Sequence, residues 1–170
     1  VDPRVLSEMR TYIRDRQNAD GSWPTDGQLE YPLGVTGTET STTAYVTWSL
    51  AHSGGDGQAV DDGVAYVREN LDVSTTDTMT LAVTLNMLVD ADRAPEFQSR
   101  VVEELRSRAT ADDGRVYWSH SNPGAEDESG SERSDAYRYG EKRVLTTATV
   151  TNALVRGDHA TNLRSGALRW

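Results

Sequence analysis

The side chains that could carry chemistry in this 170-residue chain are acids, hydroxyls and three histidines, because the chain contains no cysteine. Without thiols, these residues hold no disulfide, no thiolate zinc site and no cysteine nucleophile. His52 follows an apolar run, His120 opens a long polar stretch, and His159 precedes the last apolar-periodic segment. None of the three belongs to a recognisable motif, so we interpret them as exposed or capping residues. His120, beside Trp118, stays a candidate for a surface role.

Acidic pairs are the second possible source of chemistry. Asp61-Asp62 and Asp112-Asp113 are explained by a charge pair at a helix start and by a turn. The sequence has no G-x-S-x-G motif, and nothing in it selects two carboxylates for glycosidase chemistry. The sequence therefore predicts no catalytic residue, no metal site and no cofactor.

A short turn stands out after the first apolar-periodic run. In "QNADGSW", Gly21 can adopt a positive φ, Asp20 can accept hydrogen bonds from its own loop, and Gln17 can cap carbonyls or reach the next hairpin. Trp23 is suited to fold back as an amphipathic wedge. A weaker copy, "ADDGRVYW", ends at Trp118. We predict that Gln17, Asp20, Gly21 and Trp23 form a structural turn motif and not a catalytic one.

Apolar spacing near 3.6 residues recurs along the chain, and extended alternation with a period of two is missing, so the sequence predicts an all-α fold. Four segments are amphipathic, as expected for half-buried outer helices. Their inward residues are Leu6, Met9 and Ile13; Val60, Val64 and Val67; Phe97, Val101 and Leu105; and Leu163, Ala167 and Trp170. Arg10 and Arg14 are expected on the outer side of the first. Three segments, 42–51, 76–89 and 146–155, are apolar on most sides and are expected to be buried inner helices.

The inner segments resemble one another. "STTAYVTWSL" begins at Ser41, "STTDTMTLAV" begins 33 residues later at Ser74, and "LTTATVTNAL" begins at Leu145. Each contains a Thr-Thr pair, which we interpret as a helix N-cap. The spacing is typical of helical-hairpin repeats. An irregular acidic insertion over 111–141 separates the last copy from the others.

Alternating outer and inner helices predict antiparallel hairpins that turn in one direction, as in a solenoid or a closed ring. About seven helices would form an incomplete ring, an α/α toroid within one domain, 1–170. An exposed apolar edge is then expected near Leu163 and Trp170, with some tendency to associate. The net charge of -10 argues against nucleic-acid binding, and no apolar run is long enough to span a membrane.

The Gln, Asp-Gly and aromatic turn resembles the motif shared by three α/α-toroid families: the squalene and terpenoid cyclases, the protein prenyltransferase β subunits, and the thioester domains of α-2-macroglobulin and complement proteins. The cyclase acid clusters and the prenyltransferase zinc ligands have no counterpart here, since "DADR" at 90–93 and "DDGVA" at 61–65 depart from the acidic patterns and cysteine is missing. The ordered series "STTAYVTWSLAHSG", "AVDDGVAYVRENL", "DTMTLAVTLNML", "DDGRVYW" and "LTTATVTNALVRG" is similar to the thioester domain of bacterial α-2-macroglobulins.

That resemblance implies a non-enzymatic part of a large extracellular or periplasmic protease-trapping protein. Its partners would be the neighbouring domains and, through the whole protein, target proteases. In this family the thioester joins the Cys and Gln of a C-x-E-Q motif, which lies upstream of the helix that ends in this turn. Either that segment precedes Val1 in a longer parent or this homologue lacks it, and we expect the first.

Two other readings remain open. One is an α/α-toroid enzyme with a lipid or sugar pocket lined by Trp23, Tyr45, Trp48 and Trp118. The other is a helical interaction scaffold without chemistry. A deep cavity lined by the aromatic residues would favour the first of these.

Overall fold

The computed structural model describes residues 2–25, 37–55, 57–120 and 135–169, and in the last range it describes the side chains of 142–160 and 162–169. It contains seven α-helices and one small antiparallel hairpin in these ranges. The helices are α1 (Pro3–Arg14), α2 (Glu39–His52), α3 (Gly57–Asn70), α4 (Thr78–Ala91), α5 (Pro95–Ser107), α6 (Asp135–Arg156) and α7 (Thr161–Ala167). The strands are β1 (Thr110–Asp112) and β2 (Arg115–Tyr117), with Ala111 opposite Val116. The all-α prediction is confirmed.

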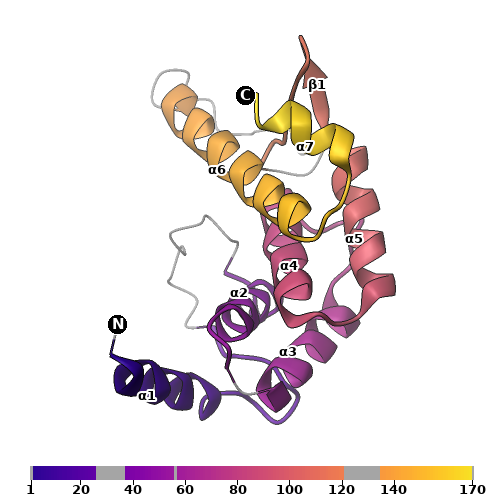
Figure 1. The fold of residues 1–170 in the computed structure, drawn as a ribbon. Helices are drawn as coiled ribbons and strands as arrows, with labels where there is room; N and C mark the ends of the chain where they lie inside the picture. The colour runs from indigo at the N-terminus through magenta and orange to yellow at the C-terminus, as the bar shows by residue number, and fades with distance from the viewer. Residues whose placement is uncertain (1, 26–36, 56, 121–134, 170) are drawn as a thin grey trace.

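The helices form two layers of an arc (Figure 1). The inner layer is α2, α4 and α6, with α4 packed between the other two. The outer layer continues from α3, against α2 and α4, to α5, against α4, and α7, against α6 and β2. The ends of the inner helices show that they run parallel, because Trp48, Asp90 and Arg156 meet near their C-termini. This arrangement is part of an α/α toroid.

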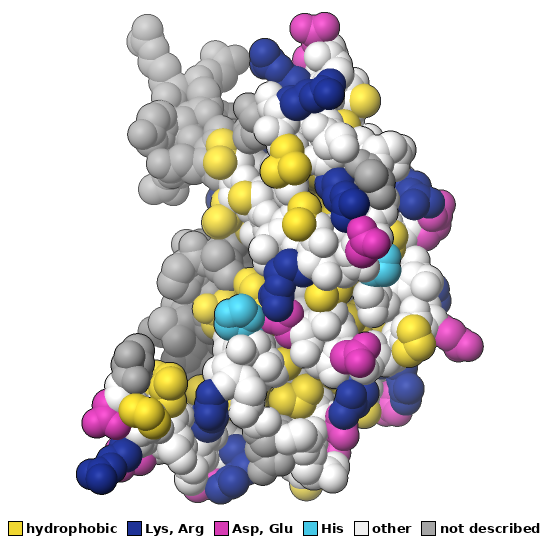
Figure 2. Space-filling view, in the orientation of Figure 1, with side chains coloured by type: hydrophobic (Ala, Val, Ile, Leu, Met, Phe, Trp, Pro, Cys, Tyr) yellow, Lys and Arg dark blue, Asp and Glu magenta, His cyan; other side chains and the backbone are white. Residues whose placement is uncertain are grey.

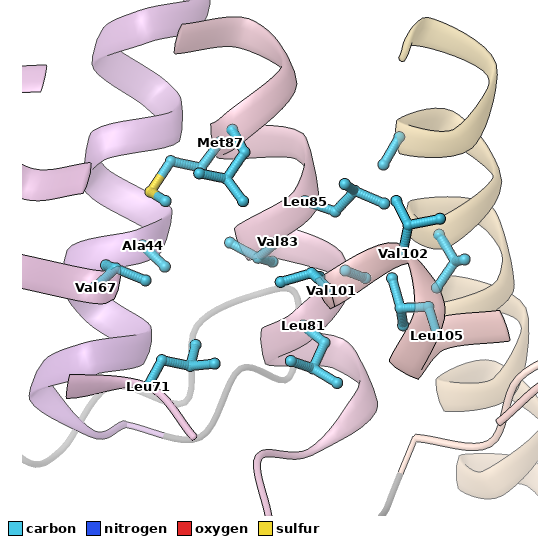
Figure 3. Close-up of a cluster of buried hydrophobic side chains, with 14 of the residues drawn as sticks. Ala44, Val67, Leu71, Leu81, Val83, Leu85, Met87, Val101, Val102 and Leu105 are labelled. Atoms are coloured by element: carbon cyan, nitrogen blue, oxygen red, sulfur yellow. The ribbon is translucent and has the colours of Figure 1, made fainter. Parts of the chain in front are cut away.

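The core lies between the layers, with α4 at its centre. Every residue from Thr78 to Leu88 is buried, as predicted for a helix that is apolar on most sides. Figure 3 shows side chains of α3 and α5 around those of α4. The apolar stripes predicted for the second and third outer helices are buried, which confirms them: Val60, Val64, Val67, Phe97, Val101 and Leu105.

The rotation of α1 differs from the prediction. Its start is as expected, because Asp2 caps the helix by accepting from the Arg4 backbone N–H and Pro3 follows. Met9, however, is 55% exposed, whereas Arg10 is half-buried and donates Nε–H to Ser53 Oγ. Contacts with residues distant in the sequence, from Arg10 to Ser53 and from Gln17 to Ala59, accompany this rotation, and local periodicity does not contain them.

The predicted N-cap role of the Thr-Thr pairs is wrong. Thr38 caps α2 and Asp77 caps α4 by accepting from backbone N–H groups at the third helical position. The pairs at 42–43 and 146–147 lie inside α2 and α6, and the pair at 75–76 precedes α4. Buried threonines are tolerated where the hydroxyl has a partner; Thr146 Oγ1, for example, donates to the Lys142 carbonyl one turn earlier.

The stretch predicted to be irregular, 111–141, needs correction at both ends. Residues 110–117 form the β1–β2 hairpin, and α6 begins at Asp135. The part between, 121–134, lies outside the described residues. At the C-terminal end, Leu163 packs against the core instead of forming an exposed edge, whereas Leu168 is 71% exposed. Trp170 lies outside the described residues. No described helix is long and apolar enough to cross a bilayer.

A buried arginine that the sequence analysis did not single out fixes the connection between α3 and α4. Arg108 follows α5, and its guanidinium donates to the carbonyls of Val73, at 3.0 Å, and Thr76, at 2.7 Å. It also pairs with Glu104 at 2.8 Å. One side chain therefore satisfies several carbonyls of a segment that has no helical partners for them.

Replacing Arg108 by alanine is expected to lower the free energy of unfolding by about 3 kcal/mol, because part-buried carbonyls lose their charged donor and Glu104 loses its partner. Urea denaturation followed by circular dichroism measures this change. Arg106→Ala is the matched control, since Arg106 pairs with Glu103 at the surface and should cost less than about 1 kcal/mol. Equal losses in the two variants would contradict the assigned role of Arg108.

Candidate functional site

The turn after α1 is held by its own polar side chains. Gln17 Nε2 donates to the carbonyl of Gly21 at 3.0 Å and to that of Ala59, on α3, at 2.9 Å. Asp20 accepts from the backbone N–H and the hydroxyl of Ser22 at 3.0 and 2.8 Å. These bonds to Ser22 hold the pKa of Asp20 below its ordinary value. Gln17 thus reaches the next hairpin, while Asp20 closes the turn itself.

Trp23 connects the turn to both helices of the hairpin. Its indole Nε1–H donates to the carbonyl of Ile13, in the last turn of α1, at 2.8 Å. Its backbone N–H donates to Thr43 Oγ1, inside α2, at 3.0 Å. The side chain is buried, so one residue packs in the core and adds a donor to a carbonyl in the last turn of the helix. We call this arrangement the Trp23 latch.

The second turn repeats the arrangement. The indole of Trp118 donates to the carbonyl of Leu105, near the end of α5, at 2.7 Å. Its backbone N–H donates to Thr147 Oγ1, inside α6, at 3.1 Å. Gly114 has a positive φ in this turn, as Gly21 does in the first. The acceptors Thr43 and Thr147 are each the second threonine of a Thr-Thr pair, so this part of the sequence repeat corresponds to a repeated contact, the Trp118 latch.

The four aromatic residues considered for a pocket do not meet in one. Trp23 and Trp118 are buried in different hairpins. Tyr45 and Trp48 lie edge to face on α2, with ring centroids 6.2 Å apart. A hollow of about 470 Å³ at the N-terminal ends of α2 and α4 is lined by none of them: its lining residues are Thr38, Thr40, Asn70, Leu71, Asp72, Thr75, Thr76, Asp77 and Thr80. The described residues therefore give no support to an aromatic lipid or sugar pocket.

A charged cluster at the opposite, C-terminal ends of the inner helices was not predicted. Asp90, whose side chain is 2% exposed, accepts from Trp48 Nε1 at 3.0 Å and lies 2.9 Å from His52 Nδ1, both through Oδ2. Its Oδ1 pairs with the guanidinium of Arg156 on α6. We call Trp48, His52, Asp90 and Arg156 the Asp90 cluster; it joins all three inner helices through one carboxylate.

The negative charge of Asp90 is compensated by its neighbours in the cluster. The C-terminal ends of parallel helices carry partial negative charge, and a buried carboxylate there needs compensation. Arg156 and the ring N–H of His52 supply it. Because a carboxylate only accepts, His52 holds its proton on Nδ1, which directs Nε2 away from Asp90. The sequence signal was faint, since Asp90 lies in the "DADR" string and its partners are 38, 42 and 66 residues away.

The remaining candidates occupy separate places. His120 Nδ1 lies 3.3 Å from Thr146 Oγ1, and His159 Nε2 lies 2.6 Å from Gln98 Nε2. Asp61 pairs with Arg93 at the surface. Among the residues that the structure describes, no three His, Asp or Glu side chains are grouped as metal ligands. Elsewhere, burial and the negative charge of Glu39 raise the pKa of Tyr66.

Taken together, the arc of inner and outer helices and the tryptophan latches define an α/α-toroid domain whose recognisable motifs serve its architecture. The family model of the A-macroglobulin TED (thioester) domain matches residues 1–170. The chain therefore belongs to the TED-domain family of the α-macroglobulins. No individual curated protein matches it significantly.

The latches predict a specific cost for losing one hydroxyl. Thr43→Val and Thr147→Val keep the shape of the side chain and leave the buried backbone N–H of Trp23 or Trp118, respectively, without an acceptor. Each is expected to lower the free energy of unfolding by about 1.5 kcal/mol, measured by urea denaturation. Thr149→Val is the control, because Thr149 Oγ1 donates only to its own helix, at Leu145, and should change stability by less than about 0.5 kcal/mol. A neutral effect in both latch variants would contradict their role.

Gly21 and Gly114 provide a second matched comparison. Both have positive φ, 89° and 74°, which costs an alanine about 1 kcal/mol. A Cβ on Gly21 would also lie 2.4 Å from the Asp62 carbonyl oxygen, whereas nothing lies within 4 Å of one on Gly114. Gly21→Ala should therefore cost about 3 kcal/mol and Gly114→Ala about 1 kcal/mol in the same denaturation experiment. Equal losses of stability in the two variants would mean that the close approach of α3 to Gly21 does not affect stability.

Proposed function

We propose that this chain is part of the thioester domain of an α-2-macroglobulin-like protein that traps proteases outside the cytoplasm, in the periplasm or the extracellular space. The observation that carries the proposal is the match of the family model along residues 1–170. The two tryptophan latches agree with it, since the turns that end at Trp23 and Trp118 use these side chains for packing. The domain itself acts without catalysis.

The reactive group lies elsewhere in this proposal. The sequence contains no cysteine, so a Cys–Gln thioester cannot form within these residues. In the parent protein, an incoming amine attacks the thioester carbonyl, forms an amide and releases the cysteine as a thiol. This chain contributes the helical framework beside that group and the surfaces on which neighbouring domains pack.

Trapping predicts that a protease keeps its activity on small substrates and loses it on large ones. The full-length parent protein is incubated with trypsin, and the remaining activity is measured on a short peptide substrate and on casein. A trapped protease is enclosed but its active site stays free, so peptide cleavage should persist while casein cleavage falls at least about tenfold. Loss of both activities, or of neither, would contradict trapping.

Methylamine tests the thioester separately. The intact parent should release one thiol per molecule on reaction with methylamine, counted with a thiol reagent, and should lose its ability to trap. The isolated 170-residue chain is the control and should release none. Trapping without thiol release would overturn the thioester part of the proposal and leave the trapping part standing.

A further inference from the structure

Helix α1 has an apolar face that no other described element covers. Val5, Met9 and Tyr12 are 46%, 55% and 57% exposed, and α1 contains no buried residue. The three side chains lie on one side of the helix, because residues three or four positions apart share a face. Figure 1 places α1 at one end of the arc, and Figure 2 shows hydrophobic side chains exposed over it, at the lower left. An apolar stripe of this kind is typical of a contact surface.

The two tryptophan latches show which other helix corresponds to α1. They end on the carbonyl of Ile13 in α1 and on that of Leu105 in α5. Both helices also begin with a proline, Pro3 in α1 and Pro95 in α5, and the two prolines precede the latch carbonyls by the same number of positions. Helix α1 is therefore the counterpart of α5, position for position.

The counterparts of the exposed residues are buried in α5. Phe97 and Val101 correspond to Val5 and Met9, and they are 3% and 0% exposed. Helix α5 packs on α4, the inner helix that precedes it, just as α3 packs chiefly on α2 and α7 packs on α6. Each of these outer helices thus covers the inner helix before it. Helix α1 is the first helix of the chain, so no inner helix of this sequence precedes it.

An arginine follows both latch helices at the same position, Arg16 after α1 and Arg108 after α5. Arg108 pairs with Glu104 one turn earlier and donates to the carbonyls of Val73 and Thr76. These carbonyls belong to the segment that enters α4. Arg108 therefore fixes the entry of the inner helix on which α5 packs.

Arg16 has the same local arrangement as Arg108 but remains exposed. Its guanidinium carbon lies 3.4 Å from the ring centroid of Tyr12, one turn earlier, and its Nη1 donates to the Tyr12 carbonyl at 3.3 Å. A guanidinium has five N–H donors, so most of its capacity is left for the carbonyls of another segment. We call Val5, Met9, Tyr12 and Arg16 the α1 seat.

We infer that the α1 seat binds a further inner helix, which lies directly upstream of α1 in the parent chain and runs parallel to α2, α4 and α6. This helix presents apolar side chains to Val5 and Met9, and Arg16 donates to the carbonyls of the segment that enters it. Three or four residues separate each described inner helix from the outer helix that follows, so the further helix ends within about five residues of Pro3. The inference goes beyond the proposed function, because it requires a longer parent chain but neither trapping nor a thioester.

Methionine oxidation tests whether the α1 seat is covered in the parent. The chain has three methionines, and Met79 and Met87, both 0% exposed, serve as internal controls for Met9. In the isolated chain, hydrogen peroxide should oxidise Met9 at least about tenfold faster than the other two, measured by mass spectrometry of peptides. In the full-length parent, oxidation of Met9 should be at least about tenfold slower than in the isolated chain. Equally fast oxidation of Met9 in both proteins would overturn the inference.

A photocrosslinker identifies what covers the seat. The parent carries p-benzoylphenylalanine in place of Met9 or, as the control, in place of Thr11, which is exposed on another side of α1. Crosslinks from the first variant should fall within about 20 residues before Val1, and those from the control should not. If the first variant fails to fold, Tyr12 is replaced instead. Crosslinks to a neighbouring domain, to residues after α1, or to a second copy, recognised by mixing isotope-labelled and unlabelled protein, would overturn the inference.

The role of Arg16 has its own matched pair of variants. Arg16→Ala should speed Met9 oxidation in the parent at least about threefold, because the helix leaves the seat more often when its entry segment loses these donors. Arg14→Ala is the control, since Arg14 pairs with Asp15 at the surface, and it should change the rate less than about 1.5-fold. Equal effects of the two substitutions would overturn the role of Arg16. Protease trapping and thiol release are measured independently, so failure here leaves the proposed function unaffected.

Discussion

The structure depends on how the chain returns from an outer helix to an inner one. At that point the last carbonyls of the outer helix lose their helical partners, and the loop must enter the core without leaving its own N–H groups unpaired. One tryptophan solves both problems. Its indole donates back to Ile13 or Leu105, its backbone donates forward to Thr43 or Thr147, and its ring fills the space between the layers. These two returns lead into α2 and α6, whereas the return from α3 to α4 has no tryptophan and is held by Arg108.

Parallel packing makes the two ends of the inner layer chemically different. The N-terminal ends of α2 and α4 border a hollow rich in threonine hydroxyls, and the C-terminal ends of all three helices meet at Asp90. A carboxylate among helix C-termini is stable only with cations or strong donors around it. Arg156, His52 and Trp48 meet that requirement, and meeting it leaves aromatic and basic groups at the surface.

The sequence predicted those features that local physics determines. Apolar periodicity located the inner and outer helices, Pro3 and Asp2 marked the first start, and the Asp-Gly pair indicated the sharp turn at Gly21. The features that the sequence did not predict depend on contacts between residues that are distant in the sequence. The rotation of α1 follows from contacts at Ser53 and Ala59, and the acceptor role of Thr43 depends on a tryptophan 20 residues away. In the sequence alone, nothing distinguishes Arg108 and Asp90 from surface charges, because they are buried by contacts with residues distant in the sequence.

Native-state hydrogen exchange tests the central claim most directly, because it reports on the latch protons themselves. If the latches hold the hairpins together, the indole and backbone N–H groups of Trp23 and Trp118 exchange only on global unfolding, with protection close to the full free energy of unfolding. The half-buried indole of Trp48 should exchange earlier. Fast exchange of the Trp23 and Trp118 protons, at rates typical of loops, would contradict the account and show that the turns follow the packing of the helices instead of fixing it.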